Sequence, residues 1–185
     1  MFKKLSVRDL TMISLFTALI CISSYIKIDL PYGVPLTAQT LAVMLTGSVL
    51  SPRQAAFSLI TYLLLGAIGA PIFAGGSAGL PIILGKTGGY LIGFLVGAVV
   101  ISLIKGKKNG LIRLGLANII AGILIINLFG AVWLNYIIGI GMVKTFMVGV
   151  LPYIPGDLFK AAAATVIANR LNKYLSYNNS QRLNK

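Results

Sequence analysis

An acid and a base stand three residues apart at the start of an apolar helix near the end of the chain. Asp157 and Lys160 follow Pro155 and precede the alanine-rich run 161–168. Proline suits a first helical turn, and Asp157 would lie in that turn, near the positive end of the helix dipole. Because residues three apart face the same side of a helix, Asp157 and Lys160 point the same way. Together they could offer one ligand a hydrogen-bond acceptor and a hydrogen-bond donor.

Composition places this pair in a membrane protein. Of the 185 residues, 57% are hydrophobic and only 10% are charged, whereas a soluble domain is about 25% charged. We therefore predict a polytopic membrane protein that has no room for a soluble catalytic domain. Charges inside a membrane are costly and usually face a cavity or a partner rather than lipid. The alternative for Asp157 and Lys160 is an ion pair at the membrane surface that only anchors the helix.

The charge balance and the scarcity of metal ligands argue against several functions. Sixteen basic and three acidic residues give a net charge of +13. Such an excess can indicate nucleic-acid binding, but here the bases lie mostly between apolar segments and at the ends. That distribution is typical of a membrane protein beside anionic lipid, so we expect no nucleic-acid partner. With no histidine and one cysteine, Cys21, we expect no cofactor, and a zinc or haem site is improbable.

The apolar runs predict one all-α membrane domain over residues 1–185, with six transmembrane helices in a single bundle. The predicted spans are 9–28, 37–50, 53–68, 90–104, 114–136 and 155–171. Residues 30–36 and the basic stretch 105–110 are expected to be turns. A long segment rich in glycine and proline, 66–89, precedes the fourth span. The connection before Pro152 leaves room for a short helix, and a polar tail is expected after the last span.

The basic residues indicate which side of the membrane the two ends occupy. Six spans put both ends on one side, and twelve of the sixteen bases fall there: Lys3, Lys4, Arg8, Arg53, Lys105, Lys107, Lys108, Arg113, Arg170, Lys173, Arg182 and Lys185. Lys27, Lys86 and Lys144 fall on the other side, and Lys160 lies within a span. Because cytoplasmic loops are rich in lysine and arginine, we predict that both ends are cytoplasmic.

This orientation brings Asp157 and the segment 66–89 together at the outer face of the bundle. Irregular backbone near membrane depth is tolerated only against protein or water. The combination therefore predicts a pocket that opens outward and is covered by the glycine- and proline-rich loop.

One motif is similar to the end of a phosphate-binding loop. Gly85-Lys86-Thr87 matches the last part of G-x-x-x-x-G-K-[ST], but Leu80 occupies the position of the first glycine. The strand that must precede such a loop is also missing from the pattern. We therefore expect the chain to carry no ATPase of its own.

A polar cluster begins the second predicted span, where Gln39 lies between Thr37 and Thr40. A buried glutamine needs hydrogen-bond partners. Gln39 either lines the pocket from the wall opposite Asp157 or caps its helix and packs internally. Its position on the outer side favours the pocket.

Small residues recur at a spacing of four in the first predicted span. Ser14 and Ala18 form one such pair, and Thr17 and Cys21 form another. Small residues at this spacing let helices approach closely. The sequence leaves open whether they form a docking face for another membrane protein or pack inside the bundle.

Three longer motifs follow one another along the chain. They are GAPIFAGG at 69–76, KTGGYLIGF at 86–94 and PGDLFKA at 155–161. In order and residue type they resemble the BioY family, the biotin-binding membrane subunits (S components) of energy-coupling-factor (ECF) transporters. The resemblance covers nearly the whole chain, including the segment around Gln39.

The resemblance implies a six-helix fold in a bacterial inner membrane and high-affinity capture of biotin from outside. It also implies a partnership with a transmembrane coupling subunit and two cytoplasmic ATPase subunits, with Ser14 and Ala18 as a docking face. Asp157 and Lys160 would be the main ligand contacts. The remaining candidate ligand-binding residues are Gln39, Gly75, Gly76, Ser77, Lys86, Gly88, Gly89 and Tyr90. Relatives often have other residues at the positions of Ser77 and Lys86.

The chemistry of biotin suits the acid–base pair. Its ureido ring has two N–H donors and one carbonyl acceptor, so Asp157 can accept and Lys160 can donate in charge-assisted hydrogen bonds. The alternatives are an S component for another vitamin, a stand-alone secondary transporter that uses Asp157 as a proton or cation site, and a small intramembrane enzyme. The enzyme is the weakest of these because only Asp157 is placed for acid–base work.

Overall fold

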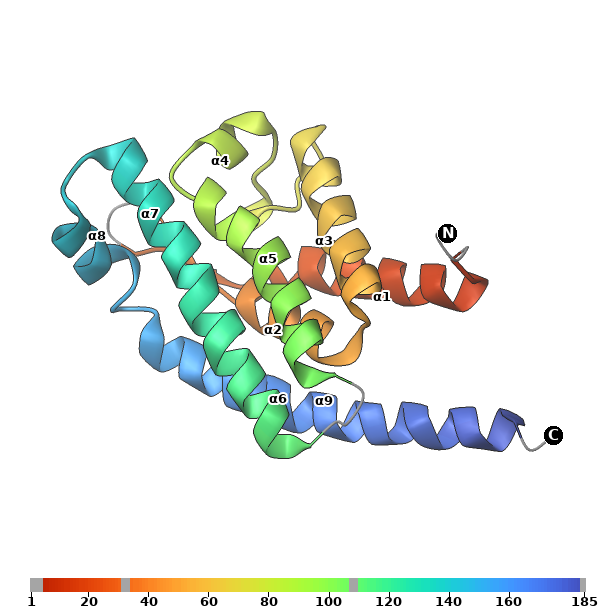
Figure 1. Ribbon diagram of the computed structural model, residues 1–185. Helices are drawn as coiled ribbons and strands as arrows, with labels where there is room; N and C mark the ends of the chain where they lie inside the picture. Colours follow the sequence, from red (N-terminus) through yellow and green to blue (C-terminus); the bar gives the residue numbers. More distant parts are fainter. Residues whose placement is uncertain (1–4, 31–33, 107–109, 184–185) are drawn as a thin grey trace.

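Helix α5 (Gly88–Lys105) runs through the middle of a helical bundle and packs against helices from both halves of the chain. The computed structural model describes residues 5–30, 34–106 and 110–183. In contact with α5 are α2 (Gln39–Val49), α3 (Pro52–Ala67), the short α4 (Leu80–Leu84) and a long helical segment from Leu111 to Ile138. Further out lie α1 (Val7–Ser23), α8 (Met142–Gly149) and α9 (Ile154–Leu183) (Figure 1).

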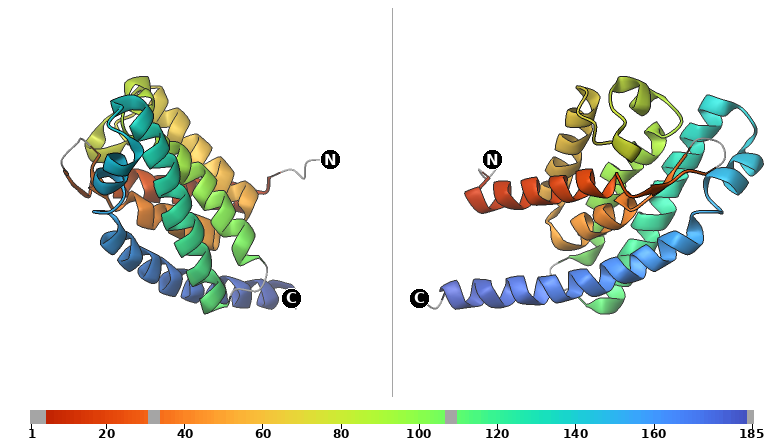
Figure 2. Two further views of the ribbon diagram at one scale, coloured as in Figure 1. Left: turned by 60° about the vertical axis from the view of Figure 1, so that its left-hand side comes forward. Right: turned by 180° about the vertical axis from the view of Figure 1, so that it is seen from behind.

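The start of α1 and the end of α9 lie on one side of the bundle, and α8 lies on the other, in all three views (Figures 1 and 2). An even number of membrane crossings requires this arrangement of the ends. Residues 31–33 of the first predicted turn lie outside the described residues, as do five of the bases that were assigned to the cytoplasmic side: Lys3, Lys4, Lys107, Lys108 and Lys185.

Helices α1 and α3 begin with the same capping motif, and a hydrogen bond joins the two motifs. The hydroxyl of Ser6 accepts from the Asp9 N–H while the Asp9 side chain bonds back to Ser6, and Ser51 and Gln54 repeat this capping box at the start of α3. Gln54 Nε2 also donates to Asp9 Oδ1 at 2.6 Å. Each box satisfies N–H groups that a helix start leaves unpaired, and the link between them fixes α1 against α3.

The fifth predicted span is one continuous helical segment with a change of winding in its middle. It consists of α6 (Leu111–Ala117), the π-helical stretch η3 (Asn118–Ile125) and α7 (Ile126–Ile138). The buried Asn118 accepts from Ser48 Oγ at 3.0 Å and donates to Thr165 Oγ1 at 3.0 Å, which ties η3 to α2 and α9. The π turns thus occur where polar side chains join three helices, a common setting for such irregularity.

Helix length and composition identify part of the predicted membrane topology. Among the described residues, two helical segments are long and apolar enough to cross a membrane, Gly88–Lys105 and Leu111–Ile138. A third crossing is possible if α8 and the described start of α9, which meet at a bend of 54°, count as one span. The shorter α2 reaches about 16 Å at 1.5 Å per residue, roughly half the thickness of the hydrocarbon core. The six-span arrangement therefore stays a prediction.

Several element boundaries differ from those predicted. Helix α1 ends at Ser23 instead of residue 28, because the chain enters a short strand at Lys27. Helix α2 begins at Gln39 since Thr37 belongs to the opposite strand. Helix α9 continues to Leu183, so the expected polar tail is helical; Asn172, whose Nδ2 donates to Ser48 O at 2.9 Å, holds it to α2.

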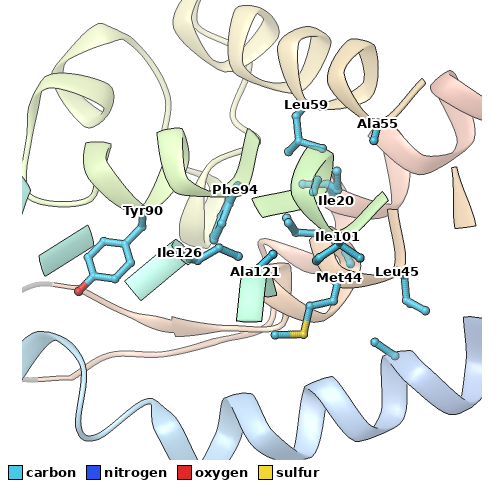
Figure 3. Close-up of a cluster of buried hydrophobic side chains, with 14 of the residues drawn as sticks. Ile20, Met44, Leu45, Ala55, Leu59, Tyr90, Phe94, Ile101, Ala121 and Ile126 are labelled. Atoms are coloured by element: carbon cyan, nitrogen blue, oxygen red, sulfur yellow. The ribbon is translucent and has the colours of Figure 1, made fainter. Parts of the chain in front are cut away.

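The apolar core fills the space between α5 and its neighbours (Figure 3). Phe94 and Ile101 extend from α5 toward Ile126 and toward the side chains of α1, α2 and α3. Glycines on α5 permit this close approach: a Cβ at Gly89 would overlap the Trp133 side chain and the Phe129 carbonyl of α7. Dense packing of this kind holds the start of α5 in a fixed position.

Two connecting segments meet at one end of the bundle. The first is a hairpin in which β1 (Lys27–Ile28) pairs antiparallel with β2 (Leu36–Thr37). The second is the segment 66–89, which contains the 3₁₀ turn η2 (Ala74–Gly76) and α4, and is therefore less irregular than predicted. Gly75 N donates to Ser24 O at 2.9 Å, and the Tyr25 hydroxyl donates to Pro71 O. These bonds join the covering segment to the end of α1.

Candidate functional site

A cavity of about 350 Å³ lies beneath these two segments, at the lower end of the range for small-molecule sites, roughly 300–1,000 Å³. It is bounded by the hairpin, the segment 66–89 and the first turns of α2, α5, α7 and α9. Its polar or charged lining residues include Lys27, Asp29, Thr37, Gln39, Thr40, Ser77, Lys86, Thr87, Tyr90, Asn127, Tyr153, Asp157 and Lys160. Apolar walls come from residues such as Val34, Leu36, Phe73, Ile82, Phe94 and Ile126.

The predicted acid–base pair lies inside this cavity. Asp157 is in the first turn of α9, and its side chain is only 4% exposed, against 14% for Lys160. The Lys160 ammonium is 3.2 Å from Asp157 Oδ1. The pair is therefore largely buried in the cavity, and its contact with a ligand stays a prediction. Removing one partner from the pair would leave an uncompensated charge.

Two residues that were not among the predicted ligand-binding residues, Thr40 and Asn127, complete the surroundings of this pair. Thr40 Oγ1 accepts from Lys160 Nζ at 2.8 Å and lies 3.4 Å from Asp157 Oδ1, to which it can donate. Asn127 Nδ2 donates to the other carboxylate oxygen, Asp157 Oδ2, at 3.2 Å. In the sequence, Asn127 is one of three asparagines in the apolar stretch 111–138, and Thr40 is a neighbour of Gln39.

Gln39 lies in the cavity wall and also packs internally, but it does not cap α2, whose N-cap is Ala38 without a side-chain cap bond. It lines the cavity and is almost fully buried. Its Nε2 donates to the hydroxyl of Tyr62 on α3, and its backbone N–H donates to Thr37 Oγ1 at 3.3 Å. Contacts with α3 and β2 thus orient Gln39, and the first turn of α2, to which Gln39 belongs, forms one wall of the cavity.

Two tyrosines form the wall between α5 and α9. The ring centres of Tyr90 and Tyr153 are 6.3 Å apart in a tilted arrangement. The Tyr90 hydroxyl donates to Gly149 O, and the Tyr153 hydroxyl donates to Val34 O at 2.6 Å. The Tyr153 carbonyl accepts from the Asp157 N–H at 2.8 Å. Tyr153, which was not predicted, therefore connects the hairpin loop to the start of α9.

The mouth of the cavity carries a second set of charges. Lys27 and Asp29 form an ion pair of 2.9 Å with side chains 35% and 73% exposed. Lys86 is also exposed and lines the cavity from the end of the segment 66–89. Lys86 was among the predicted ligand-binding residues, whereas Lys27 and Asp29 were not.

Four predicted ligand-binding glycines do not line the cavity. Gly75 and Gly76 form the η2 turn that lies against the hairpin and Tyr25. Gly88 and Gly89 start α5 and pack against Trp133. They shape the covering segment and its attachment to the bundle, while Ser77, between them in sequence, does line the cavity. Their contact with a ligand stays a prediction.

The two small-residue pairs of α1 differ in burial. Thr17 is buried, and its hydroxyl donates to Ile13 O at 2.8 Å and lies 3.1 Å from Ser58 O on α3. Ser14 and Ala18 are exposed. Thr17 therefore packs inside the bundle, and Ser14 and Ala18 do not.

Fold and site together define a helical membrane protein that encloses a small-molecule site near one end of its bundle. The model of the BioY family matches residues 1–177, so this chain belongs to the BioY family.

Curated relatives match almost the whole chain. A protein of Pyrococcus horikoshii named a probable biotin transporter is 40% identical over 164 residues, which are 89% of this chain and 96% of that protein. The biotin transporter of Thermotoga maritima is 40% identical over 167 residues, 90% of this chain and 96% of its own length.

A solved structure shares the fold. The S component for biotin from an ECF-type ABC transporter superposes with a TM-score of 0.85 at 29% identity, covering 90% of this chain and 92% of the other.

Proposed function

We propose that this chain captures biotin at the outer face of a bacterial inner membrane and delivers it across as the S component of an ECF transporter. The observation that carries the proposal is the Asp157–Lys160 pair, buried at one end of a cavity in a BioY-family bundle. Relatives named as biotin transporters and the similar S component for biotin support the ligand.

The ligand's ureido head is assigned to the buried end of the cavity. Without ligand, Asp157 and Lys160 satisfy each other at 3.2 Å. The head offers N–H donors to the carboxylate and a carbonyl oxygen to the ammonium, so both charges keep a partner when they separate to bind it. Thr40 and Asn127 hold the same two groups in place, which reduces the ordering that binding requires.

The rest of the ligand is apolar and needs a different surface. Phe73, Phe94 and Ile126 offer such a surface beside the acid–base pair. The thiophane ring and the aliphatic chain of biotin would pack against it and run toward the mouth. Burial of apolar ligand surface contributes roughly 25 cal/mol per Å² before the costs of association.

Transport requires partners in this proposal. A transmembrane coupling subunit and two cytoplasmic ATPase subunits would drive the loaded subunit to release biotin inside, with six spans and both ends cytoplasmic. The exposed Ser14 and Ala18 on α1 are assigned to the docking face. Ser14→Leu and Ala18→Leu should preserve biotin binding but reduce co-purification with the coupling subunit; unchanged co-purification would contradict the assignment.

The experiment that tests the function is equilibrium binding to the purified chain in detergent with no partners present. Labelled biotin should bind at one site per chain, and unlabelled biotin should displace it while other vitamins do not. Displacement by another vitamin at lower concentration would assign the subunit to that vitamin. Uptake by the chain alone that depends on an ion gradient would instead favour a secondary transporter.

A further inference from the structure

A second lysine–aspartate pair lies at the exposed end of the same cavity. Lys27 Nζ is 2.9 Å from Asp29 Oδ1, and both residues line the cavity. Residues two apart in an extended chain point to the same side, so the pair forms one charged face beside the mouth. Neither the sequence motifs nor the acid–base pair of α9 accounts for it.

The backbone of Lys27 is held by the hairpin. Lys27 pairs with Thr37 across the two short strands, and Thr37 also lines the cavity and bonds to Gln39. The lysine therefore extends from an element that is connected to the cavity wall.

The side chain of Lys27 lies against the covering segment. A Cβ at Gly75 would come within 2.5 Å of Lys27 Cε and 2.9 Å of Nζ. Gly75 has a φ of +68°, which glycine adopts readily and other residues do not. The absence of a side chain at Gly75 thus leaves the space that Lys27 occupies at the mouth.

A ligand whose head lies at the buried pair directs its other end toward this mouth. The chain of biotin ends in a carboxylate, the same group that Asp29 presents to Lys27. An exposed ion pair contributes little to stability, so one carboxylate can replace the other at small cost. Resting on the function proposed above, we propose that Lys27 determines specificity for a carboxylate-ended ligand by exchanging Asp29 for the ligand's carboxylate.

Asp29 has a defined role in this exchange. Its carboxylate keeps Lys27 at the mouth when the cavity is empty and competes with the ligand for the same ammonium. Lys86 is the other cation at this end, and in the part of the chain that the structure describes it forms no ion pair with a carboxylate. Lys86 stands on the covering segment and has no such competitor, so the two lysines are separable by mutation.

The test compares two ligands that differ only in the tail charge, biotin and biotin amide. Lys27→Met should weaken the binding of biotin about tenfold, as expected for a partly exposed charge-assisted hydrogen bond, and leave biotin amide unchanged. Asp29→Asn should strengthen the binding of biotin about threefold at low salt, because it removes the competitor. Lys144→Met, an exposed lysine of α8 away from the cavity, is the matched control and should alter neither ligand.

Equal changes for both ligands in Lys27→Met, or a selective loss confined to Lys86→Met, would overturn the proposal. Weaker biotin binding by Asp29→Asn would also overturn it. These results leave the proposed function intact as long as the unmodified chain binds biotin. No binding of either ligand by the folded, unmodified chain would overturn the function and the exchange together.

Discussion

The two lysine–aspartate pairs of the cavity have the same chemistry in different surroundings. Asp157 and Lys160 are 4% and 14% exposed and are held by hydrogen bonds to Thr40 and Asn127. Lys27 and Asp29 are 35% and 73% exposed on a short hairpin. Since water screens the second pair and not the first, loss of one partner should matter far more at the buried end. We therefore propose that burial, more than residue type, separates the pair that binds the ligand's head from the pair that exchanges its carboxylate.

The largest effect is expected from Lys160→Met. The change leaves the buried Asp157 carboxylate without its cation, and breaking a buried pair costs about 3–5 kcal/mol. Biotin affinity should fall by about 100-fold or more in an equilibrium titration. Lys144→Met, which removes an exposed charge of α8, should leave the affinity unchanged. Equal affinities of the two variants would remove the distinction between buried and exposed lysines.

A smaller loss is expected from Asn127→Leu, which removes the donor to Asp157 Oδ2. Biotin should bind about tenfold more weakly, because hydrogen bonds to charged groups contribute roughly 1.5–3 kcal/mol. The control is Asn118→Leu, nine residues earlier, since Asn118 is buried but does not line the cavity. It should lower thermal stability without changing the affinity. A reversed pattern would mean that Asn127 only supports the fold.

Thr40→Val should have a moderate effect. It keeps the shape of the side chain and removes the hydroxyl that accepts from Lys160 at 2.8 Å. We expect about fivefold weaker biotin binding, because a typical hydrogen bond contributes about 1 kcal/mol to the binding free energy. A titration of Thr40→Ser, which restores the hydroxyl, should recover most of the affinity; failure of this rescue would assign the loss to packing.

The smallest effect is expected from Gly75→Ala at the exposed pair. The added Cβ would overlap Lys27 and strain a backbone with φ +68°. Biotin should bind about threefold more weakly and biotin amide as before, because only an exposed charge contact is lost. Gly139→Ala has the same backbone strain at φ +70° but nothing within 4 Å of its Cβ. It should lower stability alone, and a selective effect on biotin there would contradict the role of Gly75.

Regular spacing explains which parts of this site were predictable. The pair in α9 follows from helical geometry and a proline-marked start, and the structure places its members 3.2 Å apart. The sequence gives no comparable sign of the π-helical stretch within Leu111–Ile138, because its winding depends on the contacts of Asn118 with α2 and α9.

The hairpin escaped prediction for a related reason. Its strands are only two residues each, too short for an alternating pattern, and they are fixed by pairing across a connecting loop. From the sequence alone, Lys27 and Asp29 therefore could not be distinguished from ordinary charged loop residues. The packing of Gly88 and Gly89 against Trp133 was also not predicted, and their contact with a ligand stays a prediction.

The central claim is tested most directly by titrating biotin into Asp157→Asn and Asp29→Asn side by side. Each variant replaces one carboxylate of one pair by an amide of the same size. The account predicts a loss of about 100-fold for Asp157→Asn, which leaves Lys160 buried without its counter-charge, and equal or slightly stronger binding for Asp29→Asn. Affinity near that of the unmodified chain in Asp157→Asn, or equal losses in both variants, would contradict it.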